Sequence, residues 1–464
     1  MLAILFFILR LPSLSEPYWY GDEGIYLAIG QALRHGLLLY QQIHDNKPPT
    51  LYLLAVLSQS VFAFRLLLSL WMIPTIYFFH RLTKKFLPSR LSYLSTLLFL
   101  ILTSIPLLEG NIANAEVFML LPTILAFLIF LNYKKSPFSL LLSGLLLGFA
   151  FTIKIPVAFE FGLLCLWILL FHKSKIKNLF LISVSFILPI FLYFIYFYFR
   201  GAALPFLYSS LLQNFGYLSS WATGSQQSSL GSGGLFGRAA ITFISLGIFY
   251  FCYSKKYLSK DLLFLLSWFS LALFGVLLSG RPYPHYLIQI LPSLCLLLFT
   301  FSQARLLTFI SFSVLVFSLF HFKFYFYPVF RYYGNYYSYL FHQKSLADYR
   351  RFFAPDINDI YLIADKIKSL SSPSDYLYIW GDQAYLYPLS DRLPATKYIV
   401  AYHVLDFKGY DITIKELRAK TPKLIIYFPQ VDRPFPDLDN FISEYYFLVD
   451  QIGQANIYQL RSQL

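Results

Sequence analysis

Long apolar stretches, separated by short clusters of lysine and arginine, recur along the chain up to about residue 327. An α-helix needs about 20 consecutive apolar residues to cross the hydrocarbon core of a bilayer, which is roughly 30 Å thick. Most of the stretches approach this length, and the first is shorter. The sequence therefore predicts an α-helical polytopic membrane protein with about eleven transmembrane helices, near residues 2–11, 64–82, 91–107, 116–133, 138–153, 156–172, 179–199, 235–253, 262–279, 286–301 and 306–322.

The composition excludes a water-soluble fold of this length. The 464-residue chain is 58% hydrophobic and only 13% charged, whereas soluble domains carry about 25% charged residues. A net charge of +14 could suit nucleic acid, but the basic residues lie in short clusters instead of on one continuous face. We therefore expect membrane lipid, and no nucleic acid, among the partners.

The basic clusters orient the predicted helices, because cytoplasmic loops carry an excess of Lys and Arg. With a cytoplasmic N-terminus and an odd number of spans, the clusters at 81–90, 134–135, 173–177, 255–260 and 305 all fall on the cytoplasmic side. The segments 12–63, 109–115, 201–234 and 280–285 and the C-terminal tail are then extracytoplasmic. The run 2–11 lacks a basic n-region and a small-residue cleavage site, so we expect an uncleaved first span. The predicted location is the plasma (inner) membrane, with multiple passes.

The character of the chain changes after about residue 327, where helix-like and strand-like segments begin to alternate. Residues 357–370 and 413–420 are expected to be helical, and residues 376–380 and 424–428 to be strands. We predict a transmembrane catalytic domain over 1–327, including the first outside loop 12–63, and a small extracytoplasmic α/β domain over 328–464. The latter has no GxGxxG fingerprint or P-loop, so no nucleotide is assigned to it.

Two adjacent carboxylates, Asp22 and Glu23, begin a segment of the first outside loop whose apolar residues recur at helical spacing. The spacing is typical of an amphipathic helix that lies on a membrane surface. Asp22 could simply be the N-cap of this helix. A carboxylate beside an apolar wall could also act as a general base on a hydroxyl group or help to hold a divalent cation. The two interpretations are compatible.

Lys47 precedes Pro48 and Pro49, which suit the first turn of a helix. A helix N-terminus together with an ammonium group is a natural seat for a phosphate. An exposed lysine before a helix also occurs without any function, and the residue alone does not separate these readings.

Further polar residues lie at the predicted outer ends of later spans. Glu116, next to Asn114, is costly beside hydrocarbon unless it has a partner, although it could also snorkel or cap its helix. Lys154 could pair with such a carboxylate or with a lipid phosphate. Arg281 offers a planar fork of donors that matches phosphate. With His285 and Tyr286, which follow it closely, it suits a phosphate clamp or an interfacial anchor.

These motifs, in this order, resemble the GT-C superfamily of integral-membrane glycosyltransferases. The resemblance is strongest to the bacterial branch that includes relatives of protein O-mannosyltransferases and the lipid A aminoarabinose transferase. It covers nearly the whole chain and is carried by four motifs, namely Asp22–Glu23, NKPP at 46–49, ANAE at 113–116 and RPYPHY at 281–286. Some relatives have an acidic residue immediately before KPP, whereas this chain has Asn46 there and Asp45 one position earlier.

The resemblance implies a GT-C fold with a C-terminal domain outside the membrane. It also implies that the first-loop acidic pair lies in the active site and that the KPP helix and later basic residues approach the phosphate of a polyprenyl carrier. We expect Asp22 and Glu23 to be catalytic. The expected substrate-binding residues are Lys47, Asn114, Glu116, Arg281, His285 and Tyr286.

The predicted reaction transfers a sugar from a polyprenyl-phosphate donor to an acceptor on the extracytoplasmic face, by a single inverting displacement with Asp22 as the base. Phosphate leaves as a stable anion, so cations can replace the acid that glycosidases use. The acceptor could be protein, glycan or lipid. The sequence assigns no cofactor, and it leaves open a divalent cation, Mg²⁺ or Mn²⁺, which Glu23 and Glu116 could bind.

Two other classes of protein fit a polytopic chain. A transporter or lipid flippase should place ionisable residues near the midplane and often has repeated halves. A non-catalytic binding or scaffold protein would explain the outside domain. Neither accounts for the outer carboxylates and cations as well as a glycosyltransferase does.

Overall fold

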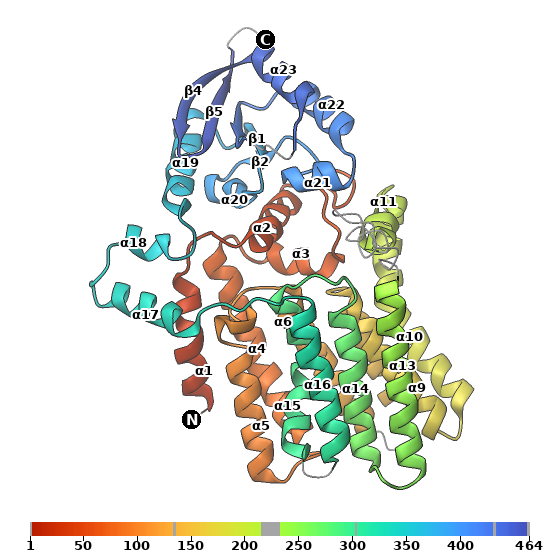
Figure 1. The fold of residues 1–464 in the computed structure, drawn as a ribbon. Coiled ribbons are helices and arrows are strands. Elements are labelled where there is room, and N and C mark those ends of the chain that lie inside the picture. Colours follow the sequence, from red (N-terminus) through yellow and green to blue (C-terminus); the bar gives the residue numbers. More distant parts are fainter. Residues whose placement is uncertain (1, 133–135, 215–232, 302–303, 430–432, 462–464) are drawn as a thin grey trace. The chain divides into compact units, whose positions relative to one another are not determined.

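The chain divides into two compact units, described from a computed structural model that covers residues 2–132, 136–214, 233–301, 304–429 and 433–461 (Figure 1). The helical unit comprises Met1–Leu11, Leu68–Phe199 and Leu211–Val329. The mixed unit comprises Pro12–Leu67, Arg200–Ser210 and Phe330–Leu464. The first predicted outside loop thus shares a compact unit with the C-terminal residues. The assignment of 1–327 and 328–464 to two functional domains stays a prediction.

Each apolar stretch predicted to span the membrane is largely helical in the structure. The stretch 116–133 is divided between α6 and α7, and several others combine an α-helix with a 3-10 turn. In the helical unit the helices are α1 (Leu2–Arg10), α4 (Val61–Thr83, which begins in the mixed unit), α5 (Ser89–Leu102), α6 (Ala115–Phe118), α7 (Leu120–Leu131), α8 (Pro137–Phe151), α9 (Ala158–Phe171), α10 (Lys175–Phe199), α13 (Gly233–Ser254), α14 (Lys260–Val276), α15 (Leu291–Thr300) and α16 (Arg305–His321), with the 3-10 turns η2 (Pro106–Leu108), η3 (Ile155–Val157) and η6 (Pro284–Ile290).

Among the described residues, three helices are long and apolar enough to cross a membrane: Val61–Thr83, Lys175–Phe199 and Gly234–Ser254. The remaining apolar helices are 10–17 residues long, which at 1.5 Å per residue is less than the roughly 30 Å of hydrocarbon. The count of about eleven spans and their orientation stay predictions. Two predicted connections, the basic pair at 134–135 and most of the outside loop 201–234, lie outside the described residues.

Two glycines one turn apart allow α8 to approach α10 closely. A Cβ atom on Gly144 would lie 2.1 Å from Ser185 Oγ and 2.3 Å from Ile182 O, and one on Gly148 would lie 2.1 Å from Phe186 O. Small residues at four-residue spacing let helix backbones come together where lipid offers no hydrophobic driving force. This contact therefore depends on the absence of two side chains.

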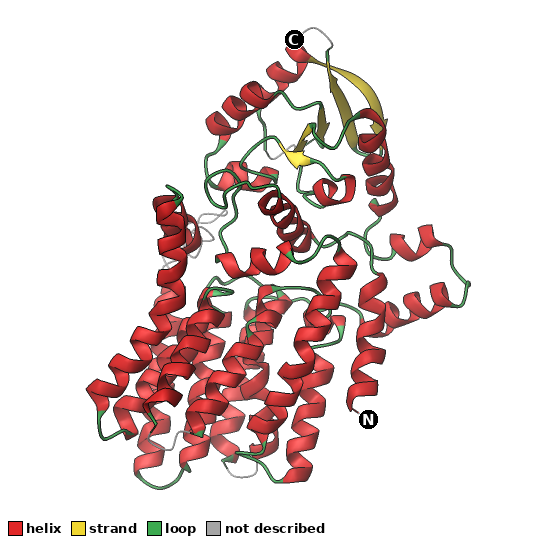
Figure 2. Cartoon of the chain, turned by 180° about the vertical axis from the view of Figure 1, so that it is seen from behind, coloured by secondary structure: helices red, strands yellow, loops and turns green. Residues whose placement is uncertain are grey.

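The mixed unit combines short helices with one small sheet, in which the strands of the described residues gather (Figure 2). Its elements are η1 (Leu11–Ser15, which begins in the helical unit), α2 (Gly21–Arg34), α3 (Pro49–Val56), α11 (Ala203–Leu207), α17 (Val329–Leu340), α18 (Leu346–Arg351), α19 (Ile357–Leu370), β1 (Tyr376–Trp380), α20 (Leu386–Ser390), β2 (Leu393–Pro394), α21 (Ala401–Asp406), α22 (Tyr410–Lys420), β3 (Leu424–Tyr427), α23 (Pro436–Tyr445), β4 (Tyr446–Ile452) and β5 (Ala455–Leu460), and a π-helical turn at Tyr208–Leu212 leads out of the unit.

The sheet has five strands in the order β2-β1-β3-β5-β4. Strands β2, β1 and β3 are parallel, and β5 and β4 add an antiparallel hairpin to the β3 edge. The interior strand β1 is a continuous apolar run, YLYIW, whose last four residues are buried. Such a run is typical of a strand covered on both faces. The predicted small α/β fold of this region is confirmed.

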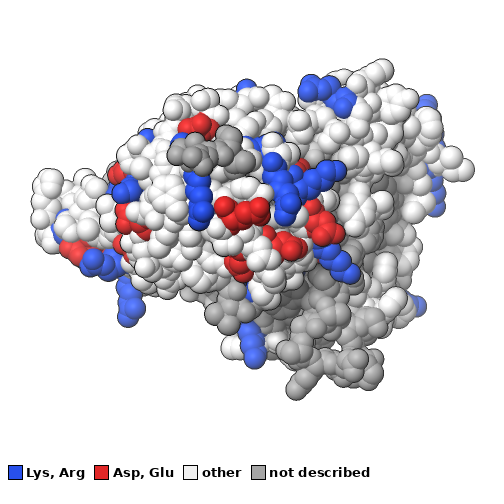
Figure 3. All heavy atoms as spheres, turned by 90° about the horizontal axis from the view of Figure 1, so that it is seen from above, with Lys and Arg blue, Asp and Glu red and all other residues white. Residues whose placement is uncertain are grey.

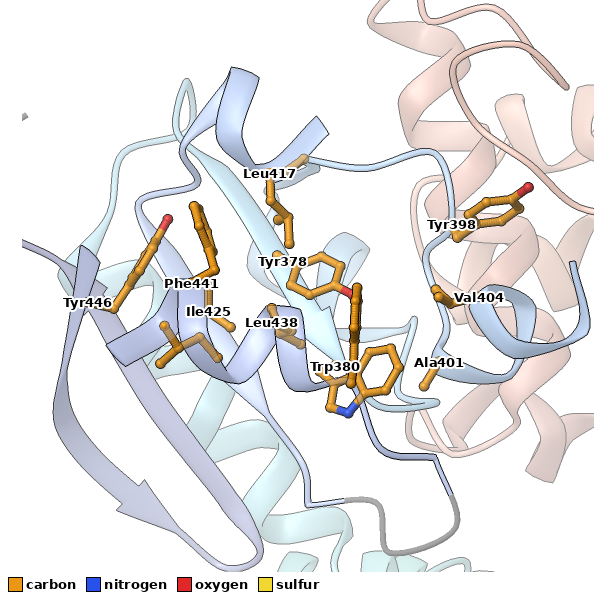
Figure 4. Close-up of a cluster of buried hydrophobic side chains, with 13 residues drawn as sticks. Tyr378, Trp380, Tyr398, Ala401, Val404, Leu417, Ile425, Leu438, Phe441 and Tyr446 are labelled. Atoms are coloured by element: carbon orange, nitrogen blue, oxygen red, sulfur yellow. The ribbon is translucent and has the colours of Figure 1, made fainter. Parts of the chain in front are cut away.

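Aromatic and aliphatic side chains fill the space between the sheet and its helices (Figure 4). They come from β1, β3, α21, α22 and α23, and include Tyr378, Trp380, Val404, Leu417, Ile425, Leu438 and Phe441, each at most 2% exposed. Because the contributing segments are far apart in sequence, this core forms only when the whole C-terminal region has folded.

Charged side chains of both signs lie on the face of the molecule seen in Figure 3. Two pairs of opposite charge in the mixed unit, Lys366–Asp450 (2.7 Å) and Arg433–Asp382 (2.7 Å), keep part of their surface exposed. Exposed pairs of this kind contribute about 0–1 kcal/mol each. Their main effect is to keep this surface compatible with water.

We predict that Gly148→Ala destabilises the protein, because its Cβ would meet the Phe186 backbone and force α8 away from α10. Overpacking of this kind costs about 1–3 kcal/mol. Thermal unfolding of the purified protein in detergent measures the change. Gly162→Ala in α9 is the matched control, because a Cβ there meets nothing within 4 Å, and it should be neutral or slightly stabilising. Equal shifts for the two variants would refute the close contact.

Candidate active site

The predicted carboxylate pair sits in the first turn of α2, yet its two members have different surroundings. The N-cap of α2 is Tyr20, so the interpretation of Asp22 as the N-cap is wrong. The Asp22 side chain is 30% exposed, whereas Glu23 is 1% exposed. Residues 23–32 are all buried, so α2 is covered on every side and is not the surface-lying amphipathic helix expected from the spacing.

Glu23 belongs to a buried ion cluster centred on Arg65. Arg65 Nε donates to Glu23 Oε1 at 2.9 Å, and its Nη2 lies 2.5 Å from Glu23 Oε2. On the other edge of the guanidinium, Nη1 lies 2.6 Å from Glu16 Oε2. The Tyr332 hydroxyl and the Trp19 indole N–H also donate to Glu16. A buried cation shared in this way fixes the start of α2.

Asp22 instead contacts Lys47, which the sequence places 25 positions later. Lys47 Nζ lies 3.4 Å from Asp22 Oδ2, and the Tyr26 hydroxyl donates to the same oxygen at 2.8 Å. The ammonium also lies 5.0 Å from the centre of the Tyr26 ring, in cation–π contact. The structure therefore brings together two residues predicted separately, a partly exposed carboxylate and an ammonium group.

The backbone of Lys47 is held at both ends. Its N–H donates to the Tyr52 hydroxyl at 3.3 Å, and its carbonyl accepts from the Tyr40 hydroxyl at 2.7 Å.

Asp45 supplies a second carboxylate, whose Oδ2 lies 3.7 Å from Lys47 Nζ. Burial alone would raise the pKa of Asp45, but Lys47 and His403 outweigh it and hold that pKa below its usual value. Asp45 is thus an ionised partner of Lys47.

A second polar cluster lies in the helical unit, at the start of α6 and in η6. Lys154 Nζ lies 2.7 Å from Glu116 Oε1 and 4.9 Å from the centre of the Tyr286 ring. His285 Nδ1 pairs with Glu109, and its Nε2 lies 3.9 Å from Glu116 Oε1. The predicted pairing of Lys154 with an outer carboxylate is confirmed. His285 is held between two carboxylates.

Asn114 and Arg281 lie close to residues of this cluster in the sequence. Asn114 is the N-cap residue of α6 and is fully buried. Arg281 is half-buried, and its backbone N–H donates to Ser279 Oγ at 3.3 Å. Their proposed roles in binding substrate stay predictions.

Two residues of these clusters, Glu109 and His403, were not predicted from the sequence. Glu109 has a left-handed backbone, with φ of 58°, and is 1% exposed. The only sequence signal for Glu109 is its place in the EGN turn. This signal is weak, because acidic residues in turns are commonly exposed to solvent. His403 lies in α21, 358 positions after its partner Asp45. No local pattern indicates such a contact.

Glu23 and Glu116, the predicted metal ligands, do not fit a divalent cation in this arrangement. Both oxygens of Glu23 accept from Arg65, and Oε1 of Glu116 pairs with Lys154. A positive side chain at ligand distance repels a metal ion from the same oxygen. Within the described residues, no group of three or more His, Cys, Asp or Glu side chains could hold a metal.

No protein-family model matches the sequence, and no curated protein matches it. Two solved structures of ArnT from Cupriavidus metallidurans match nearly the whole chain. The one bound to undecaprenyl phosphate has a TM-score of 0.58 at 11% identity and covers 100% of this chain and 98% of that chain. The apo structure has a TM-score of 0.55 at 13% identity and covers 98% and 96%. The chain has a GT-C fold.

A third match has the lower TM-score of 0.45. It is the oligosaccharyltransferase of Archaeoglobus fulgidus in complex with Zn and sulfate, at 14% identity over 98% of this chain and 72% of that chain. The GT-C resemblance inferred from the motifs is confirmed at the level of the fold by the ArnT structures.

We predict that Arg65→Met destabilises the protein by about 3–5 kcal/mol, because it leaves the buried Glu16 and Glu23 carboxylates without their cation. The free energy of unfolding of the purified protein measures this loss. Arg351→Met is the control, since it removes an exposed pair with Asp348 whose side chains are 62% and 52% exposed. The control should change stability by no more than about 0.5 kcal/mol. Similar losses of unfolding free energy in the two variants would contradict the stabilising role of the Arg65 cluster.

Proposed function

We propose that this protein is an integral-membrane glycosyltransferase that uses a polyprenyl-phosphate-linked sugar as donor. The observation that carries the proposal is the contact between Asp22 and Lys47, a partly exposed carboxylate 3.4 Å from a fixed ammonium group. The fold supports it, because an ArnT structure of the same fold is described as bound to undecaprenyl phosphate.

In the proposed reaction Asp22 accepts the proton of an acceptor hydroxyl group. The acceptor oxygen forms a bond to the anomeric carbon while the bond from that carbon to the phosphate oxygen breaks, so the configuration inverts. The electron pair leaves with the polyprenyl phosphate, whose negative charge Lys47 neutralises. A stable anion needs no proton to leave, so one base is sufficient.

Glu23 has a different role in this proposal from the one predicted. Its two oxygens accept from Arg65, and it is 1% exposed. We assign it to positioning the first turn of α2, from which Asp22 projects. Asp22 is the member of the pair that can reach a substrate.

The cluster in the helical unit is proposed to bind the substrate. Arg281 and His285 are the cations for a phosphate group, and Asn114, Glu116 and Tyr286 are the residues for polar groups of a sugar or acceptor. The 2.7 Å pair between Lys154 and Glu116 supports a preorganised site, because it fixes the direction of the carboxylate.

The proposed acceptor side is extracytoplasmic, as the positive-inside rule indicates for the loops that carry these residues. The transferred group is a hexose or pentose, and the acceptor is a protein, glycan or lipid. A divalent cation, if used, would need ligands other than Glu23 and Glu116 as they are arranged here.

We predict that Asp22→Asn lowers the rate of polyprenyl-phosphate release by about 10²- to 10⁴-fold, since the amide cannot accept the proton. The assay incubates purified protein with a panel of polyprenyl-phosphate sugars and candidate acceptors, and follows release of polyprenyl phosphate. Asp348→Asn, which changes an exposed carboxylate on α18, is the control and should keep the wild-type rate.

The same assay discriminates between functions. Near-normal release by folded Asp22→Asn protein would exclude Asp22 as the base. Wild-type protein that moves lipid between leaflets without any bond cleavage would favour the transporter reading instead. A parallel reaction with chelator tests the metal separately: a loss of release would mean that a divalent cation is used and is held by ligands other than Glu23 and Glu116 as they are arranged here.

A further inference from the structure

Asp45 lies behind Lys47 and joins it to a helix near the other end of the chain. Its Oδ2 is 3.7 Å from Lys47 Nζ, and its Oδ1 is 3.6 Å from His403 Nε2 in α21. The Asn46 backbone N–H also donates to Oδ1 at 2.7 Å. Asp45 is 1% exposed and His403 is 3% exposed. A substrate that reached Lys47 would therefore meet the ammonium group and not Asp45.

The segment that carries Asp45 is anchored to the C-terminal part of the mixed unit by a second set of contacts. The His44 N–H donates to the Lys397 carbonyl at 3.0 Å, and the His44 side chain contacts Ser209 Oγ at 3.3 Å. The His44 ring also packs 5.9 Å from the His403 ring and 4.7 Å from the Phe407 ring, measured between centroids. The position of Asp45 is consequently set by residues around α21.

We propose that Asp45 is a positioning residue that keeps Lys47 oriented and positively charged for the donor phosphate, and that His403 holds Asp45 in place. This inference rests on the proposed function, in which Lys47 meets that phosphate. It gives the small α/β fold a part in phosphate binding, through a buried carboxylate that touches no substrate itself.

The proposed reaction explains why two carboxylates flank one ammonium group. When Asp22 accepts the proton of the acceptor, it becomes neutral and no longer stabilises the charge of Lys47. Asp45 then remains as the ionised partner, at the moment when the leaving phosphate needs a cation. One carboxylate can therefore change its charge while the other keeps the ammonium group protonated.

The titratable groups that face Lys47 in the mixed unit come from several elements. Asp22 and Tyr26 face it from α2, Tyr52 from α3 and Asp45 from its own segment. His403 faces Asp45 from α21. Burial lowers the pKa of His403, so this ring competes less with Lys47 as a cation than an exposed histidine would. Asp45 is thus the buried carboxylate that lies next to Lys47.

The test measures the dissociation constant of undecaprenyl phosphate for the purified full-length protein between about pH 7 and pH 10.5. Removing an opposite charge about 4 Å away lowers the pKa of a lysine by about one unit or more. In Asp45→Asn, the pH at which affinity falls should therefore move down by about one unit or more from the wild-type value. Asp45→Asn/Lys47→Arg should restore binding at high pH, because arginine stays charged throughout this range.

Two further variants separate this role from a general loss of structure. His403→Asn should move the pH dependence in the same direction as Asp45→Asn by a smaller amount. Asp365→Asn, an exposed acid on α19, is the control and should leave it unchanged. A loss of affinity by the same factor at every pH, or no rescue by arginine, would overturn the positioning role of Asp45.

The outcomes also separate this inference from the proposed function. If wild-type protein does not bind undecaprenyl phosphate at any pH, the proposed donor is wrong. If wild-type protein binds it, Lys47→Ala weakens binding, and Asp45→Asn and His403→Asn both keep the wild-type pH dependence, then only the inference about Asp45 is wrong.

Discussion

The buried guanidinium of Arg65, shared by Glu16 and Glu23, is the constraint on which the candidate active site depends. Removing three charges from water costs several kcal/mol per ion, and the cost is recovered only while all three groups keep their geometry. The segments that carry them are consequently fixed, including the first turn of α2. The position of Asp22 also depends on this constraint, because Asp22 precedes Glu23 in the same helical turn.

Asp22 and Glu23 illustrate how one helical turn gives two identical functional groups different chemistry. Successive residues on an α-helix point about 100° apart, so Glu23 turns toward Arg65 and Asp22 toward Lys47. Glu23 is enclosed and paired with Arg65, whose guanidinium does not lose its proton. Asp22 keeps 30% of its side chain exposed and has Tyr26 and Lys47 beside it. Such a difference in surroundings commonly separates a structural acid from a reactive one.

Local patterns predicted most of the elements. The helix at 357–370 and the strand at 376–380 were predicted with the bounds that the structure has, because periodicity and residue type decide them. The candidate residues Asp22, Lys47 and His285 were also selected from their places at predicted helix starts, and Glu116 because charge beside hydrocarbon is costly. The pairing of Lys154 with Glu116 was predicted, but the contact of Asp22 with Lys47 was not, and neither was that of Asp45 with His403, because such contacts depend on tertiary structure. The burial of α2 was missed for the same reason: its polar residues find partners that spacing does not show.

The mixed unit is discontinuous in sequence, and this imposes an order on its assembly. Residues 12–67 are synthesised early, but their partners include Tyr385, which packs against Gly24, and Asp391, which accepts from Gln31. A ribosome must therefore complete more than 300 further residues before this segment can reach its native contacts. During that interval the candidate catalytic segment lacks its final support. The enzyme proposed here would become competent only after residues 385–391 have been synthesised, so a chain terminated before them would insert its helices while α2 lacks its contacts with Tyr385 and Asp391.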